Sequence, residues 1–202
     1  MGNKNQLIRN AFKNKGILET FYSSCDLVFN KGVSIIKITF LRLRGYRVDY
    51  SVVLGGDNTF FQTNKHAISI GKNSRLGKHT RVSAGFSGKI DIDKNVLLDD
   101  SSYVMSQGKI SIGENTIIAA FCYIVDFNHN YNDLKTPIVQ QGYTFSPITI
   151  EENVWVGTHV VILPGVVIGK GSVIGAGSVV TKSIKPYSIA VGNPARVIKQ
   201  RV

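Results

Sequence analysis

The sequence is poor in cysteine and shows no cysteine pattern typical of a metal site. Only two cysteines occur among its 202 residues, Cys25 and Cys122, and no CxxC or His/Cys cluster is present. This argues against a disulfide framework and against a zinc site, so we expect a reducing compartment and no resident metal. The opening stretch MGNKNQLIRNAFKNKG also lacks the apolar core of a signal peptide.

Long hydrophobic runs are absent as well. The most apolar early stretch, VSIIKITFLRLRGY, is interrupted by Lys37, Arg42 and Arg44. A helix that crosses a bilayer needs about 20 predominantly apolar residues, which this stretch does not supply. We therefore expect a cytoplasmic protein.

Acidic residues are scarce relative to basic ones. The chain has 24 Lys or Arg against 13 Asp or Glu, and residues 1–50 alone contain nine basic and three acidic side chains. Such a balance suits polyanionic partners, namely nucleic acid, phosphorylated cofactors or an anionic membrane, although it is also compatible with ordinary solubility. No aromatic-basic repeat or nucleic-acid motif accompanies the charge, so we do not expect nucleic-acid binding.

A repeat of six residues dominates the second half of the chain. The aliphatic positions of this repeat are Ile150, Val156, Ile162, Ile168, Ile174 and Val180. A second small or branched residue precedes most of them by two positions: Val154, Val160, Val166, Ser172 and Ser178. Looser copies begin at Ile70, Ile92 and Ile112, with slips of phase near residues 84–90 and 106–111.

Strand geometry explains the period. Two inward residues separated by one outward residue make a short strand, because side chains alternate across a strand. The remaining residues turn a corner, where the glycine that often follows the aliphatic residue would accept a positive φ. Three sides make a coil of 18 residues, in which Ile150 lies over Ile168 and Val156 over Ile174. The pattern predicts an all-β parallel β-helix, since it leaves no room for the crossover helices of an ordinary parallel sheet.

The chain divides into two predicted parts. Residues 1–50 form a basic, partly helical N-terminal segment, and residues 51–202 form the β-helix, with residues 51–69 as a degenerate first coil. One long loop, residues 125–148, protrudes from the coils, and loops of this length on a regular scaffold are often functional. Residues 186–202 form a tail that we expect to be a short helix.

Only one of the four histidines, His129, lies where the long loop leaves the coils. A neutral imidazole held by a neighbouring acceptor makes a good general base near pH 7, and Asp126 or a main-chain carbonyl could be that acceptor. The alternative interpretation is a surface histidine in a polar loop.

Three stretches carry a resemblance to a known family: FNHNYND, SPITIEENVWVGTHVVILPGVVIGKGSVIGAGSVVTK and VGNPARVIK. Together they resemble the hexapeptide-repeat acyltransferases, particularly the maltose/galactoside acetyltransferases and the polysaccharide O-acetyltransferases of capsule, O-antigen and colanic-acid type. The resemblance implies a left-handed β-helix and direct acetyl transfer from acetyl-CoA. It also implies His129 as the base and the backbone N–H of Gly157 as the donor to the oxyanion.

The resemblance further implies where the substrates bind. The cofactor contacts fall on Trp155, Thr158, Ala176, Thr181, Lys182, Arg196 and Lys199. Independently of the resemblance, we take Asp99 on an earlier coil, and Asn128 and Tyr131 beside His129, as candidate contacts for the acceptor sugar. Trp155 should face outward, covered by the cofactor or by a second subunit, and the family forms homotrimers with active sites between subunits.

The sequence thus predicts an acetyl-CoA-dependent O-acetyltransferase for a sugar hydroxyl of a cell-surface polysaccharide or its precursor. Two alternatives stay open, an N-acetyltransferase for a nucleotide-linked amino sugar and a non-catalytic scaffold. A carbonic anhydrase of β-helical type is disfavoured, because the histidines lack the spacing for three zinc ligands. The basic N-terminal segment resembles those of envelope-glycan O-acetyltransferases and would rest on the anionic inner face of the membrane.

Overall fold

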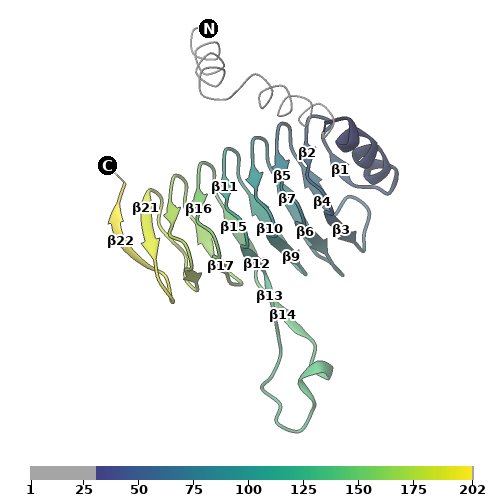
Figure 1. Ribbon diagram of the computed structural model, residues 1–202. Coiled ribbons are helices and arrows are strands. Elements are labelled where there is room, and N and C mark those ends of the chain that lie inside the picture. The colour runs from purple at the N-terminus through teal and green to yellow at the C-terminus, as the bar shows by residue number, and fades with distance from the viewer. Residues whose placement is uncertain (1–30, 202) are drawn as a thin grey trace.

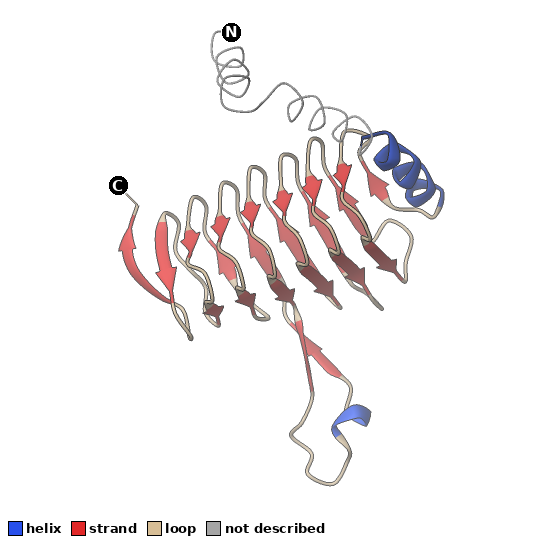
Figure 2. Cartoon of the chain, in the orientation of Figure 1, coloured by secondary structure: helices blue, strands red, loops and turns tan. Residues whose placement is uncertain are grey.

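The computed structural model describes residues 31–201, in which stacked coils build three parallel sheets. Figure 1 shows the coils running side by side, with a helix at one end, an antiparallel strand at the other and a hairpin projecting from the middle. This arrangement is the predicted parallel β-helix, and it accounts for almost all of the described chain (Figure 2).

The three sheets receive their strands in rotation along the chain. Sheet A contains β1 (Arg47–Val48), β4 (Ile68–Ile70), β7 (Lys89–Ile92), β10 (Lys109–Ile112), β15 (Ile148–Ile150) and β18 (Val167–Ile168). Sheet B contains β2 (Val53–Leu54), β5 (Arg75–Leu76), β8 (Leu97–Leu98), β11 (Ile117–Ile118), β16 (Trp155–Val156), β19 (Val173–Ile174), β21 (Ser188–Val191) and β22 (Arg196–Gln200). Sheet C contains β3 (Thr59–Gln62), β6 (Arg81–Ala84), β9 (Tyr103–Ser106), β12 (Tyr123–Val125), β17 (Val161–Ile162) and β20 (Val179–Val180).

The strand register confirms the period read from the second half of the sequence. Ile150 pairs with Ile168 and Val156 with Ile174, so these coils are 18 residues long. The earlier coils are longer, because Ile70 pairs with Ile92 and Ile92 with Ile112. The extra residues extend the sheet C strands and the turns that follow them, which are the places where the six-residue phase slips.

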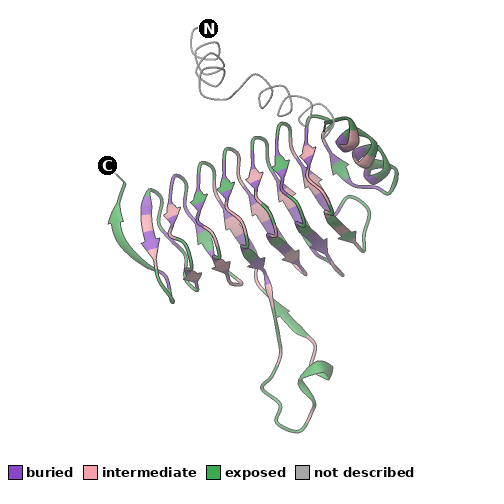
Figure 3. Ribbon diagram, in the orientation of Figure 1, coloured by how far each residue is buried: buried purple, intermediate pink, exposed green. Residues whose placement is uncertain are grey.

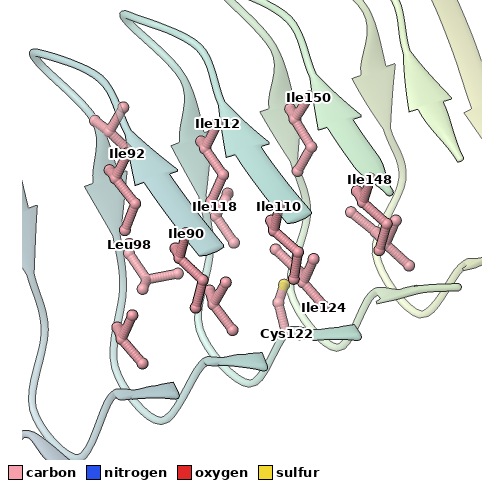
Figure 4. Close-up of a cluster of buried hydrophobic side chains, with 14 of the residues drawn as sticks. Ile90, Ile92, Leu98, Ile110, Ile112, Ile118, Cys122, Ile124, Ile148 and Ile150 are labelled. Carbon is pink, nitrogen blue, oxygen red and sulfur yellow. The ribbon is translucent and has the colours of Figure 1, made fainter. Parts of the chain in front are cut away.

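The inward aliphatic side chains of all three sheets fill one continuous core (Figure 4). The second inward position of many coils is a serine or threonine that is also buried. Its hydroxyl bonds to backbone of the next coil, as when the Ser74 hydroxyl donates to the Asp93 carbonyl at 2.8 Å and accepts from the Val96 N–H. The small polar side chains therefore satisfy carbonyls that the corners leave unpaired.

The corners use residues that tolerate a positive φ. One row of corners, after sheet A, has asparagine with φ between 58° and 59° at Asn73, Asn95, Asn115 and Asn153. Asparagine visits this left-handed region more readily than most residues. We expected the glycine after the aliphatic residue to adopt a positive φ. This prediction is wrong at Gly157, whose φ is not positive. A Cβ there would lie 2.7 Å from the Ala176 nitrogen, so this glycine allows two coils to approach closely.

A helix covers the N-terminal end of the core. Residues 31–43 are helical, Ile38 and Leu41 are buried against the first coil, and the Ser34 hydroxyl bonds to the backbone of Leu54. The predicted helical character of residues 1–50 is thus present in their described part, and residues 1–30 lie outside the described range. No helix within residues 31–201 combines the length and the apolar character needed to cross a membrane.

The C-terminal tail differs from the prediction of a short helix. The chain reverses direction after Gly192, and β22 runs antiparallel to β21. An edge strand would otherwise expose a row of unpaired N–H and C=O groups. Here β22 pairs with the edge of β21, and the hydrogen bonds between the two strands outweigh the helical tendency of RVIKQ.

Candidate functional site

The long loop is a hairpin whose two strands are β13 (Phe127–His129) and β14 (Tyr143–Phe145). His129 pairs with Tyr143, and the two ring centroids are 4.4 Å apart. A single 3₁₀ turn, η1 (Ile138–Gln140), lies near the tip. Figure 3 shows that most of this hairpin is exposed, and His129 itself is exposed. The predicted base is therefore presented to solvent, with an aromatic ring as its neighbour.

Asn128 and Tyr131, both expected to contact the acceptor, lie on the same hairpin. Asn128 is exposed on β13 opposite Thr144, and Tyr131 follows the strand with 67% of its surface exposed. Farther out, the Asp133 carboxylate accepts hydrogen bonds from the Thr136 hydroxyl and from backbone N–H groups, and the hydroxyl bond contributes most to the lowered pKa of this carboxyl. These bonds stabilise the turn that carries the tip.

Asp126 lies at the root of the hairpin, and the structure does not bring its carboxylate to His129. The side chain is fully buried. It accepts hydrogen bonds from the Ser106 hydroxyl at 2.6 Å, the Gln107 N–H at 2.8 Å and the Gly108 N–H at 3.0 Å. The interpretation of Asp126 as the group that orients His129 is therefore replaced by a structural role. It fastens the hairpin to the preceding coil.

A second cluster of predicted residues meets at the corner between β16 and β17. Trp155 faces outward as expected, with 54% of its surface exposed. Thr158 is half-buried, and its hydroxyl donates to the Ala120 carbonyl at 2.7 Å. Ala176 occupies the next coil and is exposed, beside Gly157. The two coils thus pack closely at this corner, and the side chain that Ala176 exposes there is small.

The expected oxyanion donor is already used. The Gly157 N–H donates to the Ile174 carbonyl at 2.8 Å as part of the coil-to-coil bonding. This overturns the assignment of the Gly157 N–H as the group that stabilises an oxyanion. The N–H of Thr158, one residue later, has no acceptor among the described residues. The Gly157 carbonyl accepts from the thiol of Cys122, whose pKa is raised by burial.

The predicted basic residues gather at the C-terminal end of the coils. Thr181 and Lys182 follow β20 directly, and Arg196 and Lys199 lie on β22; all four are exposed. The Ala195 N–H donates to the Val179 carbonyl, which holds the start of β22 beside β20. Within residues 31–201 none of these three cations forms an ion pair.

Asp99 occupies the corner that follows β8, two coils before Gly157. Its N–H donates to the Ile118 carbonyl, just as the Gly157 N–H donates to that of Ile174, so the two residues share one row. No hydrogen bond, ion pair or ring contact in the described part of the chain joins hairpin residues 127–145 to the corner at Gly157. The predicted site is therefore divided within one chain between the hairpin and the corner.

His159 is a residue that sequence reasoning passed over. Its Nδ1 lies 2.9 Å from the Thr158 hydroxyl, and its ring stacks on that of Phe121, with centroids 5.0 Å apart. Phe121 precedes the hairpin and His159 follows it, so their numbers conceal that they occupy equivalent corners of neighbouring coils. The six-residue repeat could have revealed this, because Phe121 and His159 each lie three residues after an inward aliphatic residue.

A broad groove lies elsewhere. It measures about 730 Å³ and runs over the outer face of sheet A. Its charged lining is mostly acidic, with Asp91, Asp93, Glu114, Glu151 and Glu152 against Arg47. Such a surface repels a polyphosphate, so we place the candidate site at the corner and the hairpin. Residues 31–201 contain no cluster of three potential metal ligands.

Comparisons with known proteins agree with this architecture. A family model described as bacterial transferase hexapeptide (six repeats) matches residues 147–182. A probable acetyltransferase of Mycobacterium tuberculosis is 37% identical over 134 residues, which is 66% of this chain and 44% of that protein. The chain thus spans less than half of that relative.

Two further proteins bear on the family and the fold. The putative lipopolysaccharide biosynthesis O-acetyl transferase WbbJ of Escherichia coli is 33% identical over 144 residues, covering 68% of this chain and 74% of that one. The solved structure of AntD, an N-acyltransferase from Bacillus cereus in complex with dTDP and 3-hydroxybutyryl-CoA, matches with a TM-score of 0.71. Its identity is 23%, covering 84% of this chain and 90% of that chain, which shows a shared fold alone.

Proposed function

This chain belongs to the bacterial transferase hexapeptide family, and from that premise we propose that it is an acetyl-CoA-dependent O-acetyltransferase. Its acceptor in this proposal is a sugar hydroxyl of a cell-surface polysaccharide or its precursor. The name of the Escherichia coli relative, a putative O-acetyl transferase of lipopolysaccharide biosynthesis, supports an envelope glycan as acceptor.

The observation that carries the proposal is a corner with a small exposed side chain, followed by cations that form no ion pair within residues 31–201. The small, exposed Ala176 lies beside Gly157, and Lys182, Arg196 and Lys199 lie farther along the same end of the solenoid. Acetyl-CoA has a narrow pantetheine arm and several phosphates, so it suits a narrow backbone track that ends in positive charge. Charge-assisted hydrogen bonds from these cations would hold the phosphates.

The proposed reaction is a direct transfer. His129 accepts the proton of the sugar hydroxyl while the oxygen attacks the thioester carbonyl carbon of acetyl-CoA. A tetrahedral oxyanion forms, for which the Thr158 N–H, which has no acceptor among residues 31–201, would be a donor on this corner. The carbon–sulfur bond then breaks, the CoA thiolate takes the proton from His129, and the acetyl ester is released. Asp99, Asn128 and Tyr131 would hold the acceptor sugar.

A homotrimer would bring the two halves of the site together. Ile117 and Trp155 are paired neighbours on the outer face of sheet B, with 45% and 54% of their surfaces exposed. Val161 and Val179 likewise stack on the outer face of sheet C. Apolar outward ladders of this kind favour a subunit contact. In such an assembly the hairpin of one subunit would carry His129 to the corner of its neighbour.

The N-terminal helix supports a contact with the inner face of an anionic membrane. Ile36, Phe40 and Leu43 lie on one face of the helix and are 73%, 60% and 81% exposed. Residues 31–48 contain five Lys or Arg side chains and no Asp or Glu. An exposed apolar stripe flanked only by positive charge fits a surface that offers both acyl chains and anionic headgroups.

Calorimetric titration with CoA tests the donor half of the proposal. Wild type should bind about one CoA per chain, and Lys182→Ala or Arg196→Ala should weaken that binding, whereas Lys109→Ala on sheet A should not. His129→Ala should retain CoA affinity and lose about 100-fold or more in turnover, the usual scale for a general base. Folded protein that binds no CoA would leave the scaffold interpretation standing.

An acceptor screen tests the other half. Transfer of the acetyl group to the nitrogen of a nucleotide-linked amino sugar, with no ester formed on any glycan hydroxyl, would replace O-acetylation by N-acetylation.

Flotation with liposomes tests the membrane contact in the full chain. The protein should float with vesicles containing phosphatidylserine and less with pure phosphatidylcholine, and Ile36→Glu with Phe40→Glu should abolish flotation. Leu134→Glu, a change at the 97% exposed tip of the hairpin, is the matched control. Equal flotation of the helix variant and the control would exclude this helix as the membrane contact.

A further inference from the structure

The hydrogen bonds around Thr158 determine the tautomer of His159. The Thr158 hydroxyl has one proton, which it donates to the Ala120 carbonyl at 2.7 Å. The same oxygen lies 2.9 Å from His159 Nδ1, so in this contact the oxygen accepts and Nδ1–H donates. A neutral His159 ring therefore carries its proton on Nδ1, and Nε2 keeps a lone pair that can accept a hydrogen bond.

The ring of His159 is held on one side and open on the other. Phe121, in the equivalent corner of the preceding coil, stacks on it with an angle of 19° between the ring planes. Gly177 occupies the equivalent corner of the following coil. A Cβ added to Gly177 would meet nothing within 4 Å, so the row of corner side chains stops at His159. The fold thus leaves a space beside the ring, on the side that leads toward the cluster of cations.

Three carbonyls close to the Thr158 hydroxyl and the His159 ring already have donors. The Thr158 carbonyl accepts from the Gly177 N–H at 2.8 Å, and the Gly157 carbonyl accepts from the Cys122 thiol. The Ala120 carbonyl accepts from both the Thr158 hydroxyl and the His159 N–H. Nε2 of His159 is therefore an acceptor on an exposed side chain, beside the carbonyls of Gly157, Thr158 and Ala120 that already have donors.

We propose that His159 binds the acyl donor, with Nε2 accepting a hydrogen bond from an amide N–H of the pantetheine arm. This inference rests on the proposed function, because it places acetyl-CoA along the corner of Gly157 and Ala176. An amide that leaves water without a new acceptor is destabilised, so a track for pantetheine needs acceptors as well as room. The Thr158 hydroxyl acts here as the group that positions the ring.

Titrations with two ligands separate this role from the rest of the site. CoA contains the pantetheine arm, and adenosine 3′,5′-bisphosphate contains only the nucleotide end. His159→Phe keeps a ring on Phe121 but removes the acceptor. It should weaken CoA binding by roughly three- to tenfold, as expected for one neutral hydrogen bond, and leave the bisphosphate unchanged. His159→Gln, which restores an acceptor, should recover part of the loss.

The outcomes distinguish this inference from the proposed function. Wild-type protein that binds no CoA would contradict the proposed function itself. Equal CoA affinity in wild type and His159→Phe would overturn only the role of His159. Equal weakening of both ligands would also overturn it, because a change in the fold would then explain the loss.

Nitrogen-15 spectra of the imidazole rings provide a readout independent of ligand binding. The neutral ring of His159, assigned by its loss in His159→Phe, should appear with the proton on Nδ1. Thr158→Val keeps the shape of the side chain but removes the oxygen that accepts from Nδ1, so it should return the ring to the tautomer protonated on Nε2. A wild-type ring already protonated on Nε2 in its neutral form would overturn the proposal.

Discussion

The buried carboxylate of Asp126 allows the division between coil and hairpin to be tested. In Asp126→Asn the shape of the side chain is retained, but one oxygen becomes an NH₂ group. If that group replaces the oxygen near Gly108, the Ser106 hydroxyl can rotate to accept from it, whereas the Gly108 N–H at 3.0 Å faces another donor. If the NH₂ group instead replaces the oxygen near Gln107, the Gln107 N–H faces a donor and loses its acceptor.

Either orientation leaves one partly buried backbone N–H without an acceptor. The cost of such a group is about 1–3 kcal/mol. Because the affected N–H groups lie in the turn that receives the hairpin root, the loss should act locally. Hydrogen exchange at the amides of Gln107 and Gly108 should accelerate by roughly 5- to 150-fold, since each 1.4 kcal/mol corresponds to a factor of ten.

Asp133→Asn provides the matched control, because it makes the same chemical change on the exposed part of the hairpin. It should leave exchange at Gln107 and Gly108 unchanged. Turnover should fall in Asp126→Asn, because the hairpin that carries His129 is loosened, while the pH dependence of turnover keeps its shape. Unchanged exchange at the two amides together with a shifted pH dependence would refute this reasoning and restore Asp126 as the partner of His129.

Two further predictions follow from perturbed side chains. Burial raises the pKa of the Cys122 thiol, so in a Cys25→Ser background it should react with iodoacetamide at least about tenfold more slowly in folded protein than in urea at pH 8. The contribution of the protonated Cys122 thiol to the stability of the fold is complete below the ordinary thiol pKa and is lost as the pH rises above that value. Rapid labelling of the folded protein would contradict the burial of this thiol. The hydrogen bond from Thr136 lowers the pKa of Asp133, so the hairpin turn should be most stable above the ordinary carboxyl range near pH 4 and lose protection as the pH falls through it. Amide exchange across the turn measures this, and a protection pattern independent of pH would contradict it.

Much of the fold could be predicted because the six-residue pattern is repeated and local. Ile150, Val156 and Ile168 occupy the inward positions that the pattern assigned to them, and the serine rows are buried as expected. Each coil contacts mainly its neighbours, so a short stretch of sequence carries nearly all the information about its own coil. The longer early coils changed the phase of the pattern but not the alternation of inward and outward residues.

The C-terminal tail could not be predicted in the same way. RVIKQ has no six-residue context, and its apolar residues suit a helix or a strand. What decided its conformation was the open edge of β21, which directly precedes β22 in the chain and is itself held in place by pairing with β19 of the preceding coil. A strand at the end of a solenoid is thus selected by its neighbour rather than by its own propensity.

For the candidate site, too, some properties could be predicted from the sequence and others could not. The sequence by itself determined which residues of the repeat turn outward, and therefore that Trp155 is accessible. It did not determine hydrogen-bond partners, because the Gly157 N–H and the Asp126 carboxylate have partners supplied by other coils.

Residues from different coils meet only when the chain is stacked, and the hairpin insertion separates Phe121 from His159 in number while leaving them in contact. The sequence alone therefore determined the coil, its inward core and its outward surface, because side-chain alternation is a local property of the strand. Only the tertiary structure decided which donors and acceptors are already used and which remain for a ligand, because every coil bonds its backbone to the next.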